Sequence, residues 1–160
     1  MNPPGAIKLR LARLTDARVM AEMSRDLIES GLGWRYTADR MTALIKDPDA
    51  TALVACDAPG IQGLAIMQFG DERAHLTLLC VKAEHQRRGI GLRLNQWMVD
   101  SARVAGIATI RLELRADNAT ALAFYRRLGF TELQTVPNYY GGHLAARRMV
   151  LRLRPDATGL

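Results

Sequence analysis

Residues 75–91, which read HLTLLCVKAEHQRRGIG, are the most informative segment of the sequence. It begins as an apolar strand over His75–Val81 and passes through a polar loop to the paired glycines Gly89 and Gly91. Beyond the glycines, apolar residues recur at helical spacing to about Gly106. The pattern predicts a strand, a tight loop and a long helix in immediate succession.

The loop Gln86–Gly91 has the composition of an anion-binding turn. Glycines allow successive backbone amides to turn towards an anion, and the dipole of the following helix adds favourable potential at its N-terminus. A Walker loop would need Gly-Lys-Ser/Thr after its second glycine, and a dinucleotide fingerprint would need a third glycine where Leu94 stands. The loop therefore favours pyrophosphate, although a plain strand-to-helix turn explains the glycines equally well when they are considered alone.

Hydrophobic periodicity divides the rest of the chain into alternating strands and helices. In the first helix, the apolar residues at helical spacing are Val19, Met20, Met23, Leu27 and Ile28. Thr15 or Asp16 is expected to cap the first helix, Thr37 the second and Asn118 the last, and Gly129 is expected to end that last helix in the left-handed conformation. Hairpins and strand-helix-strand crossovers together imply a mixed sheet with helices on its faces. We expect strands over 7–11, 51–56, 61–69, 75–81, 107–114, 130–136 and 144–153, and helices over 16–30, 38–46, 92–106 and 118–128.

Length and composition indicate a single globular domain over residues 1–160. Apolar residues make up 49% of the chain and charged residues 24%, which excludes a disordered or coiled-coil chain. The net charge is +6, and only three of the 22 basic residues are lysines. Because the arginines are scattered and no basic run carries interleaved aromatics, the charge argues for an anionic ligand or an acidic partner rather than nucleic acid.

The few cysteines and histidines argue against disulfides and metal. Cys56 and Cys80 each lie in an apolar run and are expected to be reduced core thiols. His75, His85 and His143 join no ligand-spaced cluster, so no metal is expected. No signal sequence or apolar run long enough to cross a membrane is evident, and we expect a cytoplasmic location without membrane partners.

Several segments together resemble the GNAT superfamily of acyl-CoA-dependent N-acetyltransferases. They are Val81, the loop Gln86–Gly91, Glu113, Asn118 and the run Ala123–Phe130. The segments Leu112–Asn118 and Pro137–Tyr140 are similar to RimI-type enzymes, which acetylate the N-terminal amine of a ribosomal protein. The resemblance implies an α/β (α+β) fold with a mixed, mostly antiparallel central sheet of six to seven strands and helices on both faces.

The same resemblance implies acetyl-CoA as cosubstrate and assigns roles to individual residues. The catalytic base falls on Glu113 and the acid on Tyr125, while Asn118 contacts the CoA. Backbone of Leu79, Cys80 and Val81 holds the pantetheine arm, and Arg87, Arg88, Gly89, Ile90, Gly91 and Leu92 hold the pyrophosphate. Trp34, Tyr139 and Tyr140 are candidates for lining the acceptor groove.

Residue chemistry supports these roles but leaves alternatives open. A carboxylate can deprotonate an amine, and a tyrosine with a pKa near 10 can protonate a leaving thiolate. Glu113 lies at the same alternation phase as Arg111 and Arg115, so it could also be an exposed strand carboxylate paired with one of them. Tyr125 could be a core aromatic, and Asn118 is a preferred helix cap whatever the function.

The acceptor is expected to be a primary amine, either a peptide N-terminus or a small amine of the polyamine or aminoglycoside type. A non-catalytic acyl-CoA sensor is the second hypothesis, but such a sensor needs neither Glu113 nor Tyr125. A nucleic-acid binder is the third, and it rests only on the basic charge. A homodimer is left open beside a monomer.

Overall fold

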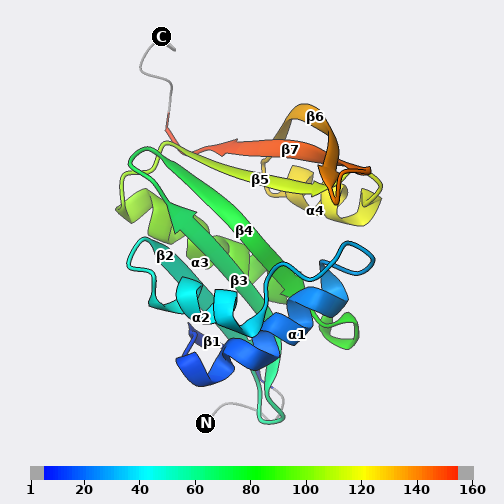
Figure 1. The fold of residues 1–160 in the computed structure, drawn as a ribbon. Helices are drawn as coiled ribbons and strands as arrows, with labels where there is room; N and C mark the ends of the chain where they lie inside the picture. Colours follow the sequence, from blue (N-terminus) through cyan, green and yellow to red (C-terminus); the bar gives the residue numbers. More distant parts are fainter. Residues whose placement is uncertain (1–5, 155–160) are drawn as a thin grey trace. The chain divides into compact units, whose positions relative to one another are not determined.

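The computed structural model describes residues 6–154 of the chain (Figure 1). The α-helices and short 3-10 helices in this part are η1 (Leu14–Asp16), α1 (Ala17–Leu27), α2 (Ala38–Lys46), η2 (Ala83–His85), α3 (Ile90–Val104) and α4 (Ala119–Arg127). The strands are β1 (Lys8–Leu11), β2 (Ala50–Cys56), β3 (Ile61–Phe69), β4 (Arg73–Val81), β5 (Thr109–Arg115), β6 (Thr131–Tyr140) and β7 (Leu144–Arg152).

The strands form one mixed sheet in the order β1-β2-β3-β4-β5-β7-β6. Pairing is antiparallel for β1 with β2, β2 with β3, β5 with β7 and β6 with β7, whereas β4 and β5 run parallel. Pro137 lies on β6, an edge strand, where a missing backbone donor is tolerated. The predicted mixed, mostly antiparallel sheet is confirmed.

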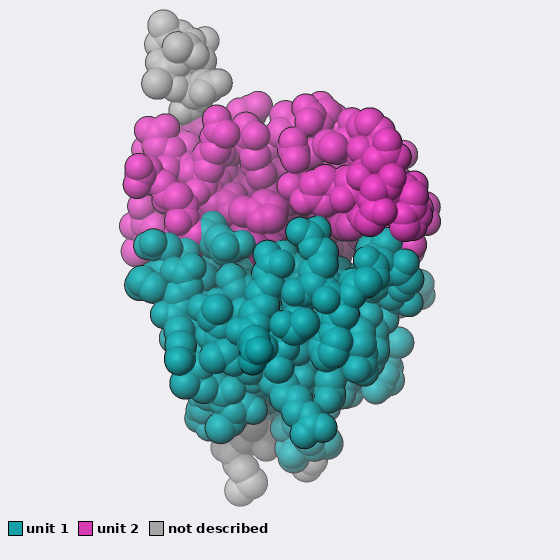
Figure 2. Space-filling view, viewed as in Figure 1, with its two compact units in different colours: residues 1–68, 78–98 teal, residues 69–77, 99–160 magenta. Residues whose placement is uncertain are grey.

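Contacts divide the chain into two compact units, which are described separately (Figure 2). Unit 1 comprises residues 1–68 and 78–98, and unit 2 comprises residues 69–77 and 99–160. Strand β4 and helix α3 each contribute residues to both units. The single domain expected over residues 1–160 stays a prediction.

Unit 1 buries apolar side chains on both faces of β2 and β3. Val54 of β2 and Leu64 of β3 pair directly and pack with α1 and α2, which lie in front of the strands in Figure 1. On the other face, a Cβ on Gly63 would lie 3.3 Å from Leu94 and 3.4 Å from Ile90, both of α3. Unit 1 therefore has helices on both faces of its strands, as expected.

Helix α1 is shorter than predicted, and only part of its predicted apolar set is buried, namely Met20 and Met23. Its inward stripe contains Ala17, Met20, Ala21 and Ser24, which follow the i, i+3, i+4, i+7 spacing of one helical face. Val19 and Leu27, at positions expected to be apolar contacts, are instead 40% and 39% exposed.

Unit 2 buries one face of β5 and leaves polar side chains on the other. Ile110, Leu112 and Leu114 are buried, and the residues between them are partly buried. A Cβ on Gly129, just after α4, would lie 3.4 Å from Leu151, which pairs with Ile110. The end of α4 therefore lies against the apolar face of these strands.

Two of the three expected helix caps are confirmed. The Asn118 side chain accepts a hydrogen bond from the amide of Ala121 at 3.0 Å, and that of Thr37 accepts one from Arg40 at 3.4 Å. The prediction for the first helix was wrong, because neither Thr15 nor Asp16 caps α1 through its side chain. The Asp16 carboxylate instead forms an ion pair with Arg10 at 2.7 Å.

Gly129 ends α4 with a φ of 98°, which confirms its predicted left-handed conformation. Among the helices of residues 6–154, none combines the length and apolar character needed to span a bilayer.

Candidate active site

The loop Gln86–Gly91 belongs to unit 1 and leads from β4 and η2 into α3; we call it the glycine loop. Two of its residues adopt left-handed backbone, Arg87 with a φ of 64° and Gly89 with a φ of 79°. Alternation of right- and left-handed residues turns successive amides to one side, which is the geometry of anion-binding backbone nests. Arg87, Arg88 and Gly89 are exposed, and α3 begins at Ile90. The loop therefore presents two guanidinium groups and a helix N-terminus to solvent.

Polar contacts tie the base of this loop to the end of β4. The side-chain amide of Gln86 donates to the carbonyl of Val81 at 2.9 Å. Arg88 contacts the ring of His85 at 3.1 Å. These contacts hold the loop in place against the strand it follows.

The end of β4 offers backbone rather than reactive side chains. Burial raises the pKa of the Cys80 thiol to about 12, so this side chain stays protonated at neutral pH. Both Cys80 and Cys56 are free thiols, as the sequence predicted. The Cys80 carbonyl would lie 3.2 Å from a Cβ on Gly63, so only glycine fits comfortably there. Leu79–Val81 lie beyond Arg73–His75, the part of β4 that pairs with β5.

Gly89→Val is expected to weaken CoA binding by at least about tenfold. A Cβ at position 89 would meet no atom within 4 Å, so the substitution acts through backbone conformation and not through a clash. A β-branched residue resists the positive φ that the loop requires. Titration calorimetry with CoA measures the effect, and Gly106→Val, at another exposed left-handed glycine, is the matched control. Undiminished CoA affinity in Gly89→Val would remove the loop from the cofactor site.

In unit 2, the Glu113 carboxylate lies at the centre of a polar cluster. Oε2 lies 2.9 Å from Nε2 of His75, and Oε1 accepts hydrogen bonds from the Tyr139 hydroxyl at 3.3 Å and from Arg148 at 3.5 Å. The Glu113 side chain is only 11% exposed. The sequence alternative of pairing with Arg111 or Arg115 is replaced by pairing with Arg148, which lies directly opposite on β7.

Two opposing effects set the pKa of Glu113. Burial raises it, but the hydrogen bond and charge of His75, the charge of Arg148 and the Tyr139 hydroxyl together outweigh burial and leave the pKa below its ordinary value. Glu113 is therefore ionised at neutral pH. It can attract a cationic amine. Because its pKa is lowered, it holds a proton taken from that amine only transiently.

His75 enters this cluster because β4 and β5 run parallel in register. His75 pairs with Arg111, and its ring reaches Glu113 on the next residue of the same face. Since an ionised carboxylate accepts, Nε2 carries the proton towards Glu113, and Nδ1 faces the Thr77 hydroxyl at 3.1 Å. From the sequence, His75 is only a secondary base candidate with a structural role preferred. The residues around His75 in β4 do not indicate that its partner, Glu113, lies 38 residues away in sequence.

The approach of Tyr139 depends on an irregularity in β6. The register between β6 and β7 shifts between Val136 and Tyr140, and Asn138 has a φ of 56°, which asparagine tolerates better than most residues. Such a bulge re-aims side chains. It directs the Tyr139 hydroxyl to Glu113, and the Tyr140 ring packs edge-on against Tyr139 with centroids 4.8 Å apart.

Helix α4 carries Asn118 at its N-cap and Tyr125 in its last turn. Asn118 is exposed, and its oxygen is used for capping. Tyr125 is buried, with its ring edge-on to Phe124 at 5.1 Å and to Phe130 at 5.4 Å. The aromatic-core alternative thus describes the packing of the Tyr125 ring.

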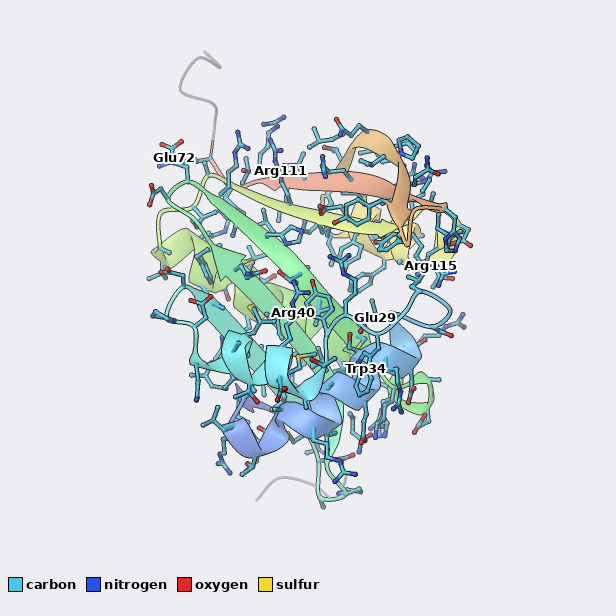
Figure 3. The ribbon with its side chains drawn as sticks, viewed as in Figure 1. Glu29, Trp34, Arg40, Glu72, Arg111 and Arg115 are labelled. Atoms are coloured by element: carbon cyan, nitrogen blue, oxygen red, sulfur yellow. The ribbon has the colours of Figure 1, made fainter. Side chains whose placement is uncertain are left out.

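The loop between α1 and α2 fixes Trp34 in unit 1. The indole Nε1 donates to the carbonyls of Ala21 at 3.2 Å and Tyr36 at 3.0 Å, and the Arg25 guanidinium lies 5.2 Å from the ring centroid. The ring remains 43% exposed. Trp34, labelled in Figure 3, is therefore an ordered and accessible aromatic, as a groove residue would need to be.

A buried carboxylate that the sequence did not single out organises this loop. Glu29 accepts hydrogen bonds from the amides of Arg35 at 2.7 Å and Tyr36 at 3.2 Å and from the Ser24 hydroxyl at 3.0 Å. An acidic residue at the end of an amphipathic helix resembles a solvent-facing charge, so the sequence carried no signal for this role.

The predicted site residues thus gather in separate groups. Unit 1 brings Leu79–Val81 and Arg87–Leu92 to the end of β4 and the start of α3. Unit 2 brings Glu113 and Tyr139 into contact and adds His75 and Arg148. Within residues 6–154, no group of His, Cys, Asp or Glu side chains has an arrangement that could hold a metal ion.

Known proteins resemble this chain in both sequence and fold. It is 41% identical over 76 residues to the [ribosomal protein bS18]-alanine N-acetyltransferase of Escherichia coli strain K12, a match covering 48% of this chain and 51% of that protein. The chain thus spans about half the length of the curated relatives it matches. The crystal structure of the ribosomal-protein-S18-alanine N-acetyltransferase from Escherichia coli superposes with a TM-score of 0.81 at 25% identity, over 97% of this chain and 99% of that one.

Arabidopsis thaliana NAA60, crystallised with acetyl-CoA, has the same fold, with a TM-score of 0.81 at 17% identity over 92% of this chain and 99% of that one. The family model described as the acetyltransferase (GNAT) family matches residues 19–130, which is more than half of the sequence. These residues include β4, the glycine loop, Glu113 and α4. The chain therefore belongs to the GNAT acetyltransferase family.

Proposed function

We propose that this chain transfers the acetyl group of acetyl-CoA to the α-amine of a protein N-terminus, with Glu113 as base and Tyr125 as acid. The observation that carries the proposal is the Glu113 carboxylate, which is held ionised by His75, Tyr139 and Arg148 on a strand of a GNAT-family chain. The N-terminal acceptor is supported by the similarity to enzymes that act on ribosomal protein bS18.

The cofactor side of the proposal rests on unit 1. The exposed guanidinium groups of Arg87 and Arg88 and the left-handed backbone at Gly89 fit a pyrophosphate, because they combine charge with accessible amides. Backbone of Leu79–Val81 would hold the pantetheine arm, and Asn118 of unit 2 would add a contact to the CoA. When bound, acetyl-CoA supplies the thioester that the amine attacks.

The amine side rests on the charge of Glu113. An α-amine has a reference pKa of about 7.7 to 8.0, so a fraction is neutral near pH 7 and the remainder is a cation that Glu113 attracts. Glu113 would accept the proton directly or through a water. Because the pKa of Glu113 lies below its ordinary value, the carboxyl group would then release this proton readily. His75 and Arg148 would keep the carboxylate oriented during this step.

Protonation of the departing CoA thiolate is assigned to Tyr125 in this proposal. Its hydroxyl is protonated at neutral pH and would donate to the departing thiolate. Burial of the ring between Phe124 and Phe130 limits its motion, which would keep the donor in one place. Trp34, Tyr139 and Tyr140 would contact the acceptor, and a cytoplasmic location and a homodimer both stay predictions.

Release of free CoA with a panel of acceptors tests this proposal. Peptides with different free N-termini are compared with the same peptides blocked at the α-amine, with peptides carrying only a lysine amine, and with polyamines and aminoglycosides. We expect turnover with free N-termini and loss of turnover when they are blocked. Preference for small amines would overturn the peptide acceptor, and CoA binding without turnover on any amine would favour the sensor hypothesis.

A further inference from the structure

One sheet face of unit 2 carries an excess of arginine that the reaction itself does not require. Arg111 and Arg115 alternate with buried leucines on β5 and so share the face of Glu113; both are labelled in Figure 3. Directly paired residues point to the same side of a sheet. The remaining members are Arg148 and Arg152 of β7, opposite Glu113 and Thr109, and Arg73 of β4, beside Thr109. We call these five residues the arginine face.

Carboxylates neutralise only part of this face. Arg148 contacts Glu113 at 3.5 Å, and Arg115 contacts Asp117 at 3.5 Å. Across residues 6–154, no carboxylate lies within ion-pairing distance of Arg73, Arg111 or Arg152. The face therefore keeps three uncompensated positive charges on the side of the strands opposite to α4.

The Arg111 guanidinium is incompletely hydrogen-bonded within the described residues. Its Nε is buried and has no hydrogen-bond partner, and it is the one such side-chain atom in the described part of the chain. Buried polar atoms in folded proteins are almost always paired, because leaving one unpaired costs free energy. A carboxylate can accept from a guanidinium through two parallel hydrogen bonds, which makes it a well-matched partner.

We propose that the arginine face binds acidic side chains at the third to fifth positions of the acceptor peptide. The inference rests on the proposed N-terminal acetyltransferase function. At a rise of about 3.3 Å per residue, Arg111 lies about 7 Å from Glu113 along β5. Thr109, which pairs with both Arg152 and Arg73, lies about 13 Å from Glu113 along the same strand. An extended peptide has the same rise, so residues that follow an amine held at Glu113 would pass these arginines in turn.

The test compares three peptides with the same first two residues and with acidic, neutral or basic residues at positions three to five. We expect kcat/KM to be about tenfold higher for the acidic peptide than for the neutral one at low salt, and lowest for the basic one. The advantage should shrink as salt rises, because these charges are partly exposed. Equal values for acidic and neutral peptides would overturn the inference and leave the acetyltransferase proposal standing.

Variants assign the preference to this face. Arg111→Gln combined with Arg152→Gln should bring the ratio of acidic to neutral kcat/KM close to one, whereas Arg111→Lys, which keeps the charge, should retain part of it. Arg103→Gln combined with Arg127→Gln removes an equal charge from α3 and α4 of the same unit, outside the face, and should keep the wild-type ratio. A ratio unchanged in the double variant, with an unchanged melting temperature, would contradict the assignment.

Nucleic acid is the other polyanion that such a face could attract. Binding of a short RNA duplex is therefore measured for wild type and the double variant across a salt series. We expect no binding that depends on Arg111 and Arg152. RNA binding that is lost in the double variant and that blocks peptide acetylation would replace the acidic peptide as the ligand of this face.

Discussion

Tyr125→Phe is expected to lower kcat by about 10² to 10⁴-fold, the usual size of general acid catalysis. The substitution keeps the ring that packs against Phe124 and Phe130 and removes only the hydroxyl proton. The thiolate would then leave without protonation, which slows the chemical step and not the binding of CoA. Steady-state kinetics gives kcat, and calorimetry gives the CoA affinity, which should stay within about twofold.

The control for Tyr125→Phe is Tyr36→Phe, which removes the same hydroxyl from a tyrosine outside the proposed site. Loss of a buried hydroxyl can also cost about 1 kcal/mol of unfolding free energy, so the melting temperature of both variants is recorded. A wild-type kcat in Tyr125→Phe would remove Tyr125 as the proton donor. A fall in kcat matched by a fall in CoA affinity would point to a structural role.

Glu113→Gln is expected to lower kcat/KM near pH 7 by about 10²-fold or more, with part of the activity returning as pH rises. The amide is close in size to the carboxylate but cannot take a proton or attract an ammonium group. Above a pH of about 8 the α-amine loses its proton without help, so the variant should approach wild type there. The measurement is kcat/KM against pH with one free N-terminal peptide.

The pKa of Glu113 fixes the shape of the wild-type profile. Because that pKa is lowered, the carboxylate is ionised throughout the neutral range and loses its charge only as pH falls through the lowered value. A wild-type limb near neutral pH therefore belongs to the amine and not to Glu113. A Glu113→Gln profile that overlays wild type would dismiss Glu113 as the base.

Glu132→Gln is the matched control for Glu113→Gln. Glu132 lies on β6 of the same unit, and its carboxylate is bound by Arg147 at 2.6 Å and Arg126 at 2.9 Å. These contacts likewise lower its pKa. Since Glu132 belongs to no part of the proposed site, its loss should leave the pH profile of kcat/KM in place.

The strands, the helices and the glycine loop could be predicted from the sequence. Local rules suffice for these features: alternation places Leu112 and Leu114 opposite Glu113, asparagine caps α4 and a left-handed glycine ends it. The boundaries differ by a few residues, and the cap of α1 was wrong because Asp16 found a stronger partner in Arg10. An ion pair with a neighbouring strand is invisible to a rule that reads one helix terminus.

The surroundings of Glu113 depend on the tertiary structure and could not be predicted from the sequence. His75 and Arg148 are 38 and 35 residues away in sequence, and they reach the carboxylate because one parallel and one antiparallel pairing set β4 and β7 in register with β5. The bulge in β6 then brings the Tyr139 hydroxyl to Oε1 of the same carboxylate. Residue types along a chain specify candidates, but strand pairing between distant segments sets the distances on which hydrogen bonds and pKa values depend.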